Sequence, residues 1–168
     1  MGNIEDMQDH QIPQGFTLGL AIVDAIPVVE FCISMLVIAL RFQSILFMIG
    51  AFCSILAGCG KVLWKILLAM KQKNIVWLNK QFRYLMSIGF LLMIVAVIVH
   101  LNTLHLGAVL LRALQLPAVV FFVLGICGMV VMGILGAKLD PTVAKNNWKE
   151  QITNLVAQAM LLIGILLW

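Results

Sequence analysis

Five long apolar runs, separated by short polar segments, dominate the chain. They cover residues 16–40, 44–70, 84–104, 116–137 and 151–168. A helix of about 20 residues crosses the roughly 30 Å hydrocarbon core of a bilayer, so each run is long enough for one crossing. The pattern predicts an all-α fold, a polytopic membrane helix bundle with about five transmembrane helices. We expect a single transmembrane domain over residues 16–168, preceded by an acidic cytoplasmic segment at residues 1–15.

The composition is typical of a membrane protein rather than a soluble one. Hydrophobic residues make up 63% of the 168 residues and charged residues 11%, with a mean hydropathy of +1.10. An ordinary soluble domain has about 25% charged residues. The net charge of +4 does not indicate nucleic-acid binding, because the basic residues lie in loops beside apolar runs, where they report membrane orientation.

The distribution of basic residues predicts that orientation. If the chain crosses the membrane five times, two basic loop residues lie on the same side as the C-terminus, Arg41 and Arg112. Seven basic residues lie on the side of the N-terminus: Lys71, Lys73, Lys80, Arg83, Lys138, Lys145 and Lys149. Cytoplasmic loops carry an excess of lysine and arginine. We therefore expect a multi-pass protein of the cell membrane with a cytoplasmic N-terminus and an extracytoplasmic C-terminus.

Two helix boundaries are uncertain in the sequence. Asp140 followed by Pro141 is typical of a helix start, and a helix from there could pass Trp148 at the interface and continue into the fifth run. The polar stretch 64–83 allows two interpretations. Its first residues can end the second crossing, with a loop at 71–83 after them, or the stretch can lie along the membrane surface.

Four charged residues fall inside the first two runs: Asp24, Glu30, Lys61 and Lys65. In an antiparallel hairpin centred on residues 42–43, Asp24 and Lys61 lie at one depth, so we predict that they pair. Lys65 lies one turn lower, on nearly the same face. Glu30 lies about 9 Å above Asp24 and about 120° around the helix, and we expect it to be neutral or solvated by a cavity. An unpaired ion at the bilayer centre costs at least about 2.5–3.5 kcal/mol.

Pro27 lies between the two acids and leaves the Val23 carbonyl without its helical donor. A free carbonyl beside two carboxyl groups would suit a cation or a proton-carrying water. The alternative is structural: Lys65, and with it Lys61, reaches the cytoplasmic interface from the end of a shorter second crossing, and Asp24 holds the hairpin in register.

An amide stripe marks the last run. Asn147, Gln151, Asn154 and Gln158 are spaced four, three and four residues apart, so they share one helix face. Lipid cannot satisfy amides, and we predict that this face lines a cytoplasm-facing polar cavity together with Asp24, Lys61 and Lys65. Lys145 and Lys149 at its mouth would attract an anionic lipid headgroup or solute. The alternative is hydrogen bonding between helices.

Small residues are predicted to permit close helix packing. They form one face of the second run, Gly50, Ser54 and Gly58, and one face of the fourth run, Gly125, Gly128 and Gly136. The cysteines lie inside apolar runs without metal-ligand spacing, and we interpret them as packing residues: Cys32, Cys53, Cys59 and Cys127. His100 is assigned a hydrogen-bonding role near the outer interface.

No catalytic or cofactor motif is apparent, so we predict no catalytic residues, no metal and no cofactor, and the chain is more typical of a non-enzyme. The leading hypothesis is a transporter or channel-like subunit that binds a cation, proton or small polar or anionic solute. The alternatives are a non-catalytic accessory or scaffold subunit of a larger complex and, more remotely, a membrane enzyme acting on lipid. The expected partners are the bilayer, anionic headgroups at the cytoplasmic face, and a second copy or a larger membrane subunit. The main candidate binding residues are Asp24, Glu30, Lys61, Lys65, Asn154 and Gln158, with a second tier of Asn147, Gln151, Lys145, Lys149 and His100.

Overall fold

The computed structural model of the protein describes all residues except 1–16, 72–74, 101–105 and 140–143. The described residues form helices and connecting turns, with no strand among them: α2 (Leu18–Phe42), α3 (Ile45–Lys71), α4 (Val76–Val99), α5 (Leu106–Ala113), α6 (Ala118–Lys138) and α7 (Ala144–Leu167). All except α5 are long and apolar enough to cross a membrane. The predicted all-α membrane bundle is confirmed, and the acidic N-terminal segment lies outside the described residues.

Two helices begin earlier than the apolar runs alone indicated. α4 starts at Val76 rather than at residue 84, and α7 starts at Ala144 rather than at residue 151. The polar first turns of each helix therefore continue the transmembrane helix instead of lying apart on the surface. Asp140 and Pro141, the predicted start of the last helix, lie outside the described residues.

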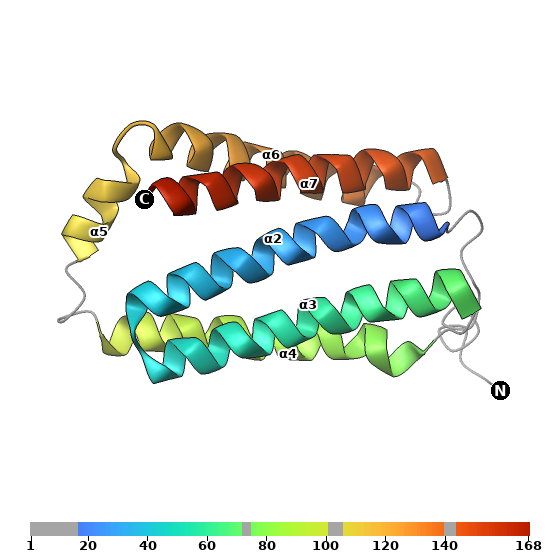
Figure 1. The fold of residues 1–168 in the computed structure, drawn as a ribbon, viewed down its shortest axis with the longest axis horizontal. Coiled ribbons are helices and arrows are strands. Elements are labelled where there is room, and N and C mark those ends of the chain that lie inside the picture. The colour runs from blue at the N-terminus through green and yellow to red at the C-terminus, as the bar shows by residue number, and fades with distance from the viewer. Residues whose placement is uncertain (1–16, 72–74, 101–105, 140–143) are drawn as a thin grey trace.

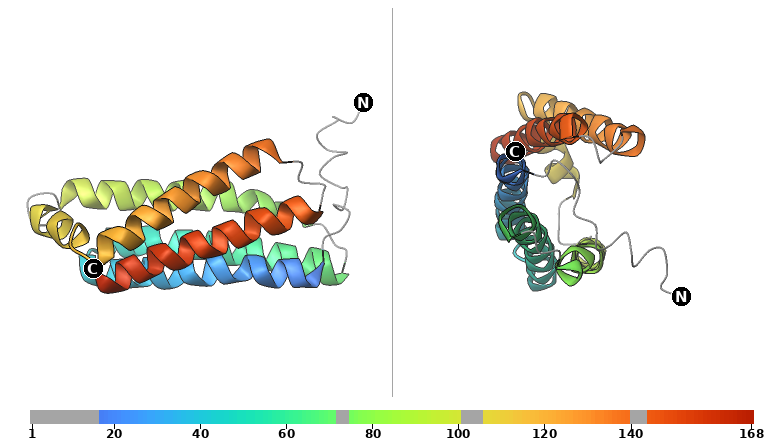
Figure 2. Two further views of the ribbon diagram at one scale, coloured as in Figure 1. Left: turned by 90° about the horizontal axis from the view of Figure 1, so that it is seen from above. Right: turned by 90° about the vertical axis from the view of Figure 1, so that its right-hand side faces the viewer.

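The five long helices form one curved layer (Figures 1 and 2). Neighbouring helices pack in the order α4, α3, α2, α7, α6. The view along the helices in Figure 2 shows an arc, with α4 and α6 as its two edges. We call the inner side of this arc the concave side. The end of the bundle at which α2 and α7 begin and α3 stops is called the basic end.

A two-residue turn joins α2 to α3. Gln43 adopts a left-handed conformation with φ 49°, and its backbone N–H donates to the Ala39 carbonyl at 3.2 Å, which closes α2. Ser44 then caps α3, because its Oγ accepts from the Phe47 backbone N–H at 3.5 Å. The rings of Phe42 and Phe47 stack with centroids 4.6 Å apart. The turn holds the two helices antiparallel.

Glycine allows α3 and α4 to approach closely. A Cβ atom on Gly89 would lie 2.3 Å from Ser54 Oγ and 2.7 Å from the Gly50 carbonyl oxygen. Ser54 Oγ donates to that carbonyl at 3.0 Å, so its polar group is satisfied within α3. The other predicted glycine face behaves similarly, since Gly125 and Gly128 lie against Leu161 and Ala157 of α7. The expectation of close packing at these faces is confirmed.

A polar clamp joins three helices at the end opposite the basic end. Arg41 on α2 donates through Nη1 to the Ile165 carbonyl at 3.0 Å, and its guanidinium lies 5.2 Å from the centroid of the Trp168 ring. Trp168 Nε1 in turn donates to the Val109 carbonyl of α5 at 3.0 Å. The clamp satisfies helix-terminal carbonyls that lipid could not.

The close approach at Gly89 can be tested with a matched glycine. We expect Gly89→Ala to lower the free energy of unfolding by about 1–3 kcal/mol, because overpacking outweighs the gain in helix propensity. Gly133→Ala on α6 is the control, since nothing lies within 4 Å of a Cβ there. Thermal unfolding in detergent measures both. Equal melting temperatures for the two variants would contradict the packing.

Candidate functional site

An ion pair within the bundle links α2 to α3. Lys65 Nζ donates to Asp24 Oδ2, and the two side chains are only 12% and 10% exposed. Pairing offsets the cost that an isolated charge carries inside a bilayer. The predicted link between the first two helices is present, but the predicted partner, Lys61, is wrong.

The direction in which helical side chains lean explains the change of partner. Each side chain tilts toward the N-terminus of its own helix. In an antiparallel pair, the Asp24 carboxylate therefore leans away from the hairpin turn, whereas a lysine on α3 leans toward it. Lys65 starts one turn farther from the hairpin turn and reaches the carboxylate, while Lys61 points past it. The prediction that Asp24 pairs with Lys61 compared only the depths of the two backbone positions and did not include the tilt of the side chains.

Lys61 contacts α4 instead. Its ammonium lies 4.3 Å from the centroid of the Phe82 ring, within cation–π distance. The charges of Lys65, Asp24 and Glu150 act on it, but among the described residues Lys61 makes no ion pair. Of the two acids whose charges act on Lys61, Asp24 is therefore engaged by Lys65, and Glu150 makes no ion pair with Lys61 among the described residues.

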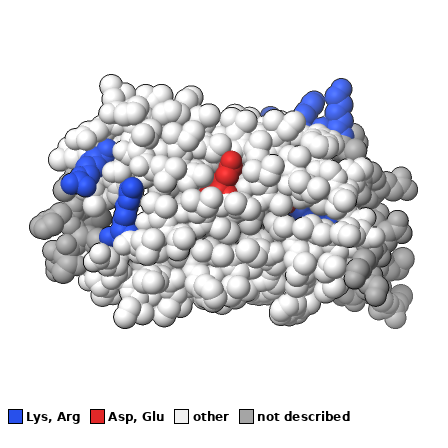
Figure 3. Space-filling view, in the orientation of Figure 1, with Lys and Arg blue, Asp and Glu red and all other residues white. Residues whose placement is uncertain are grey.

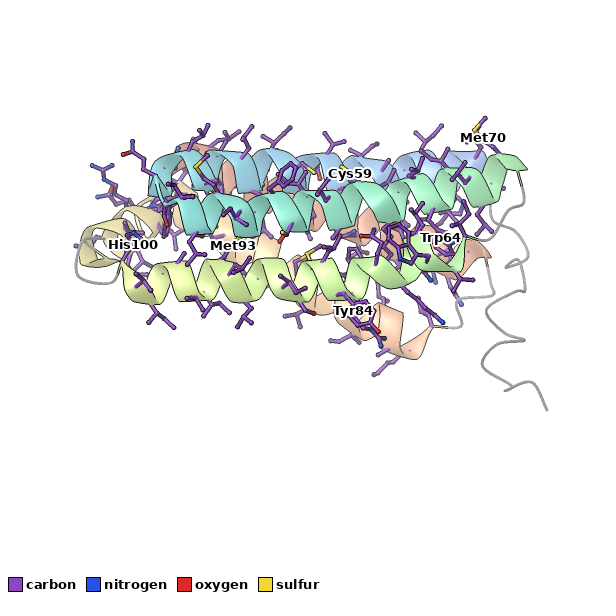
Figure 4. All side chains as sticks on the ribbon, turned by 90° about the horizontal axis from the view of Figure 1, so that it is seen from below. Cys59, Trp64, Met70, Tyr84, Met93 and His100 are labelled. Atoms are coloured by element: carbon purple, nitrogen blue, oxygen red, sulfur yellow. The ribbon has the colours of Figure 1, made fainter. Side chains whose placement is uncertain are left out.

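Lys61 lies in a cleft of about 710 Å³ between α3 and α4 at the basic end. Figure 4 shows Tyr84, one of its lining residues, projecting from α4 away from α2, while Cys59 lies on the other side of α3. Three cations and no acid line the cleft. The complete lining is Lys61, Asn79, Lys80, Phe82, Arg83, Tyr84, Met86 and Ser87.

All of these residues except Lys61 lie on α4 and were not among the sequence candidates, and Asn79, Lys80, Phe82 and Arg83 belong to a stretch whose location the sequence left open. A signal was nevertheless present. Asn79, Arg83 and Ser87 recur every four residues, and Lys80 lies beside them, so they share one face of a helix. Gln81 points to the neighbouring face, where its Nε2 donates to the Ala57 carbonyl at 3.4 Å and anchors α4 on α3.

Glu30 lies outside the cleft, on a part of α2 separated from the ion pair by about 120° around the helix. Its Oε2 atom is buried and has no hydrogen-bond partner among the described residues, and the same holds for Ser34 Oγ one turn later. Figure 3 shows the side of the molecule away from the concave face, which is mostly uncharged, with one acidic group near its middle and basic groups toward both ends.

The amide stripe on α7 faces protein, since all four of its residues are half-buried. Gln158 Nε2 donates to the Met129 sulfur of α6 at 3.7 Å, and Gln151 Oε1 is buried without a partner among the described residues. Asn154 belongs to the same half-buried set, whereas Lys145 and Lys149 are exposed. Of the six main sequence candidates, only Lys61 lines the cleft.

His100 lies at the end of α4 that is far from the cleft. Its Nδ1 atom is 2.9 Å from the Ala96 carbonyl oxygen, a contact within its own helix. In the described part of the chain, no three His, Cys, Asp or Glu side chains gather in a way that could hold a metal ion. No known protein family, curated protein or solved structure matches the chain.

The identity of the Asp24 partner can be measured with a double-mutant cycle. Asp24→Asn leaves Lys65 unpaired and should destabilise the protein by about 3 kcal/mol, as loss of one member of a buried pair does. Adding Lys65→Met should recover most of that loss, because neither charge then remains. Thermal unfolding in detergent reports both values.

Lys61 supplies the control for this cycle. Adding Lys61→Met to Asp24→Asn should recover little or nothing, since Lys61 does not pair with Asp24. Recovery by Lys61→Met and not by Lys65→Met would contradict the assigned pair.

Proposed function

We propose that this multi-pass membrane protein binds an anionic group in the cleft between α3 and α4, as a transporter or channel-like subunit. The observation that carries the proposal is the charge of the lining: three cations, three neutral polar side chains and no acid. A concave site with a few convergent polar groups is the usual setting for ligand binding. Arginine and lysine together favour phosphate or carboxylate ligands.

Lys61 strengthens this proposal because of its position. It lies on a transmembrane helix, where an ionisable group is costly and usually functional. Asp24 is held by Lys65, and Glu150, whose charge also acts on Lys61, makes no ion pair with it among the described residues, so the cleft leaves room for an external anion beside Lys61. The excess of basic residues at this end supports a cleft that opens toward the cytoplasm.

Glycerol 3-phosphate is a suitable probe of the cleft because it presents a phosphate without a lipid chain. We expect it to raise the melting temperature of the purified protein and to lose most of this effect in Arg83→Gln. Lys138→Gln is the matched control, because Lys138 is a basic residue at the basic end, the last residue of α6, and does not line the cleft. Equal stabilisation of wild type and Arg83→Gln would contradict an anion site in the cleft.

A second candidate function is proton or cation movement at Glu30. The specific observation is the pair of buried oxygen atoms, on Glu30 and Ser34, that lack partners among the described residues. A carboxyl group on a transmembrane helix is a common element of proton relays. In proteoliposomes, this function requires a pH-dependent flux that disappears in Glu30→Gln, with binding of glycerol 3-phosphate unchanged. A flux that is identical in wild type and variant would remove Glu30 from the pathway.

An accessory role remains the alternative to transport. The arc has an open concave side, which a second copy or a larger subunit could cover. Purification from native membranes distinguishes the two functions. The accessory role is favoured if the protein purifies in a stable complex with a second polypeptide and the isolated chain shows no flux of glycerol 3-phosphate.

A further inference from the structure

An apolar groove of about 320 Å³ lies beside the cleft, nearer the opposite end of the bundle. Side chains from α2, α3 and α4 line it, and all are apolar: Met35, Phe47, Phe90, Met93, Ile94, Val97 and Ile98. Phe90 is only three residues beyond Ser87 of the cleft, a rise of about 4.5 Å along α4. The groove therefore begins where the cationic lining ends.

The cleft and the groove share the same faces of both helices. On α3, Phe47 of the groove and Lys61 of the cleft are 14 residues apart. At about 100° and 1.5 Å per residue, their side chains leave the helix in directions that differ by about 40°, and they lie about 21 Å apart along the helix axis. On α4, Arg83, Phe90 and Ile94 follow one another at helical spacing on one side. Along α4 the two spaces therefore follow one another, the charged one at the basic end and the apolar one toward the opposite end, while on α3 the contact of Gly50 and Ser54 with Gly89 lies between them.

We propose that the ligand of the cleft is an anionic phospholipid, with its phosphate beside Lys61 and Arg83 and one acyl chain in the groove. This inference rests on the proposed anion site and adds the class of ligand. Charge complementarity selects an anionic headgroup, and the adjoining apolar groove selects a chain-bearing ligand over a free solute. The order along α4, cations first and apolar side chains after them, matches the order of headgroup and acyl chain in a phospholipid whose headgroup lies at the basic end and whose chain runs past the middle of the helix.

The proposal predicts that the acyl chain contributes to binding. Thermal unfolding of the full chain in a zwitterionic detergent is titrated with long-chain phosphatidic acid, the matched phosphatidylcholine and glycerol 3-phosphate. Phosphatidic acid should bind on the order of tenfold or more tightly than either of the others. Arg83→Gln should abolish the preference over phosphatidylcholine, because it removes a charged contact to the phosphate.

Two double variants on α4 isolate the groove. Ile94→Ala with Ile98→Ala removes two exposed groove side chains, whereas Leu91→Ala with Val95→Ala removes two exposed side chains outside it. The first pair of substitutions should weaken the binding of phosphatidic acid about tenfold and leave the binding of glycerol 3-phosphate unchanged. The second pair should leave both ligands unchanged, which controls for general loss of apolar surface.

The outcomes separate the two proposals. Suppose that glycerol 3-phosphate binds as tightly as phosphatidic acid and depends on Arg83, and that Ile94→Ala with Ile98→Ala has no effect. The lipid proposal is then wrong, and the proposed anion site is retained. If phosphatidic acid and phosphatidylcholine bind equally, the lipid proposal is likewise overturned. If no phosphate compound stabilises the protein in an Arg83-dependent manner, the anion site fails, and the lipid proposal fails with it.

Discussion

The ion pair between Asp24 and Lys65 determines the electrostatics of the bundle. Within hydrocarbon, each charge requires a partner, water or a protonation change. Lys65 pairs with Asp24 of α2. Lys61 therefore lies beside the Phe82 ring of α4 and has no ion-pair partner among the described residues. The lining of the cleft contains three cations and no acid. An acid paired with Lys61 instead would have neutralised the deepest cation there.

Close packing provides the scaffold for this arrangement. The glycine contacts between α3 and α4, and between α6 and α7, bring the helices of each pair near to backbone contact. α2 joins the two pairs through its contacts with α3 and α7. The five helices therefore form an arc rather than a closed bundle, and the concave side remains bounded by α4 and α6. Transmembrane packing relies on such small-residue contacts because apolar burial alone does not distinguish helix from lipid.

Much of the fold could be predicted from the sequence, because a membrane requires long apolar helices and the runs supply them. The glycine faces were likewise predictable from their spacing of three and four residues. The order of helices around the arc was not, since apolar periodicity does not say which neighbour a face meets. Residues such as Val76 and Ala144 fall in polar segments, so hydropathy placed the starts of α4 and α7 too late.

The candidate site was predicted only in part, for two physical reasons. Lys61 was identified because a charge inside an apolar run is rare, but its partner was misassigned because side-chain tilt was not considered. Asn79, Lys80 and Arg83 were missed because a polar stretch at a membrane interface is equally typical of a surface segment. Only the packing of α4 on α3, anchored by Gln81, turns that stretch into one wall of a cleft.

The most direct test of the central claim is amine-selective labelling of the protein in intact membranes, read residue by residue by mass spectrometry. Lys65 should be protected by its ion pair, whereas Lys61 should react from the cleft and become protected when glycerol 3-phosphate is added. Rapid labelling of Lys65 together with protection of Lys61 in the absence of ligand would contradict the assigned pair and the cationic cleft that depends on it.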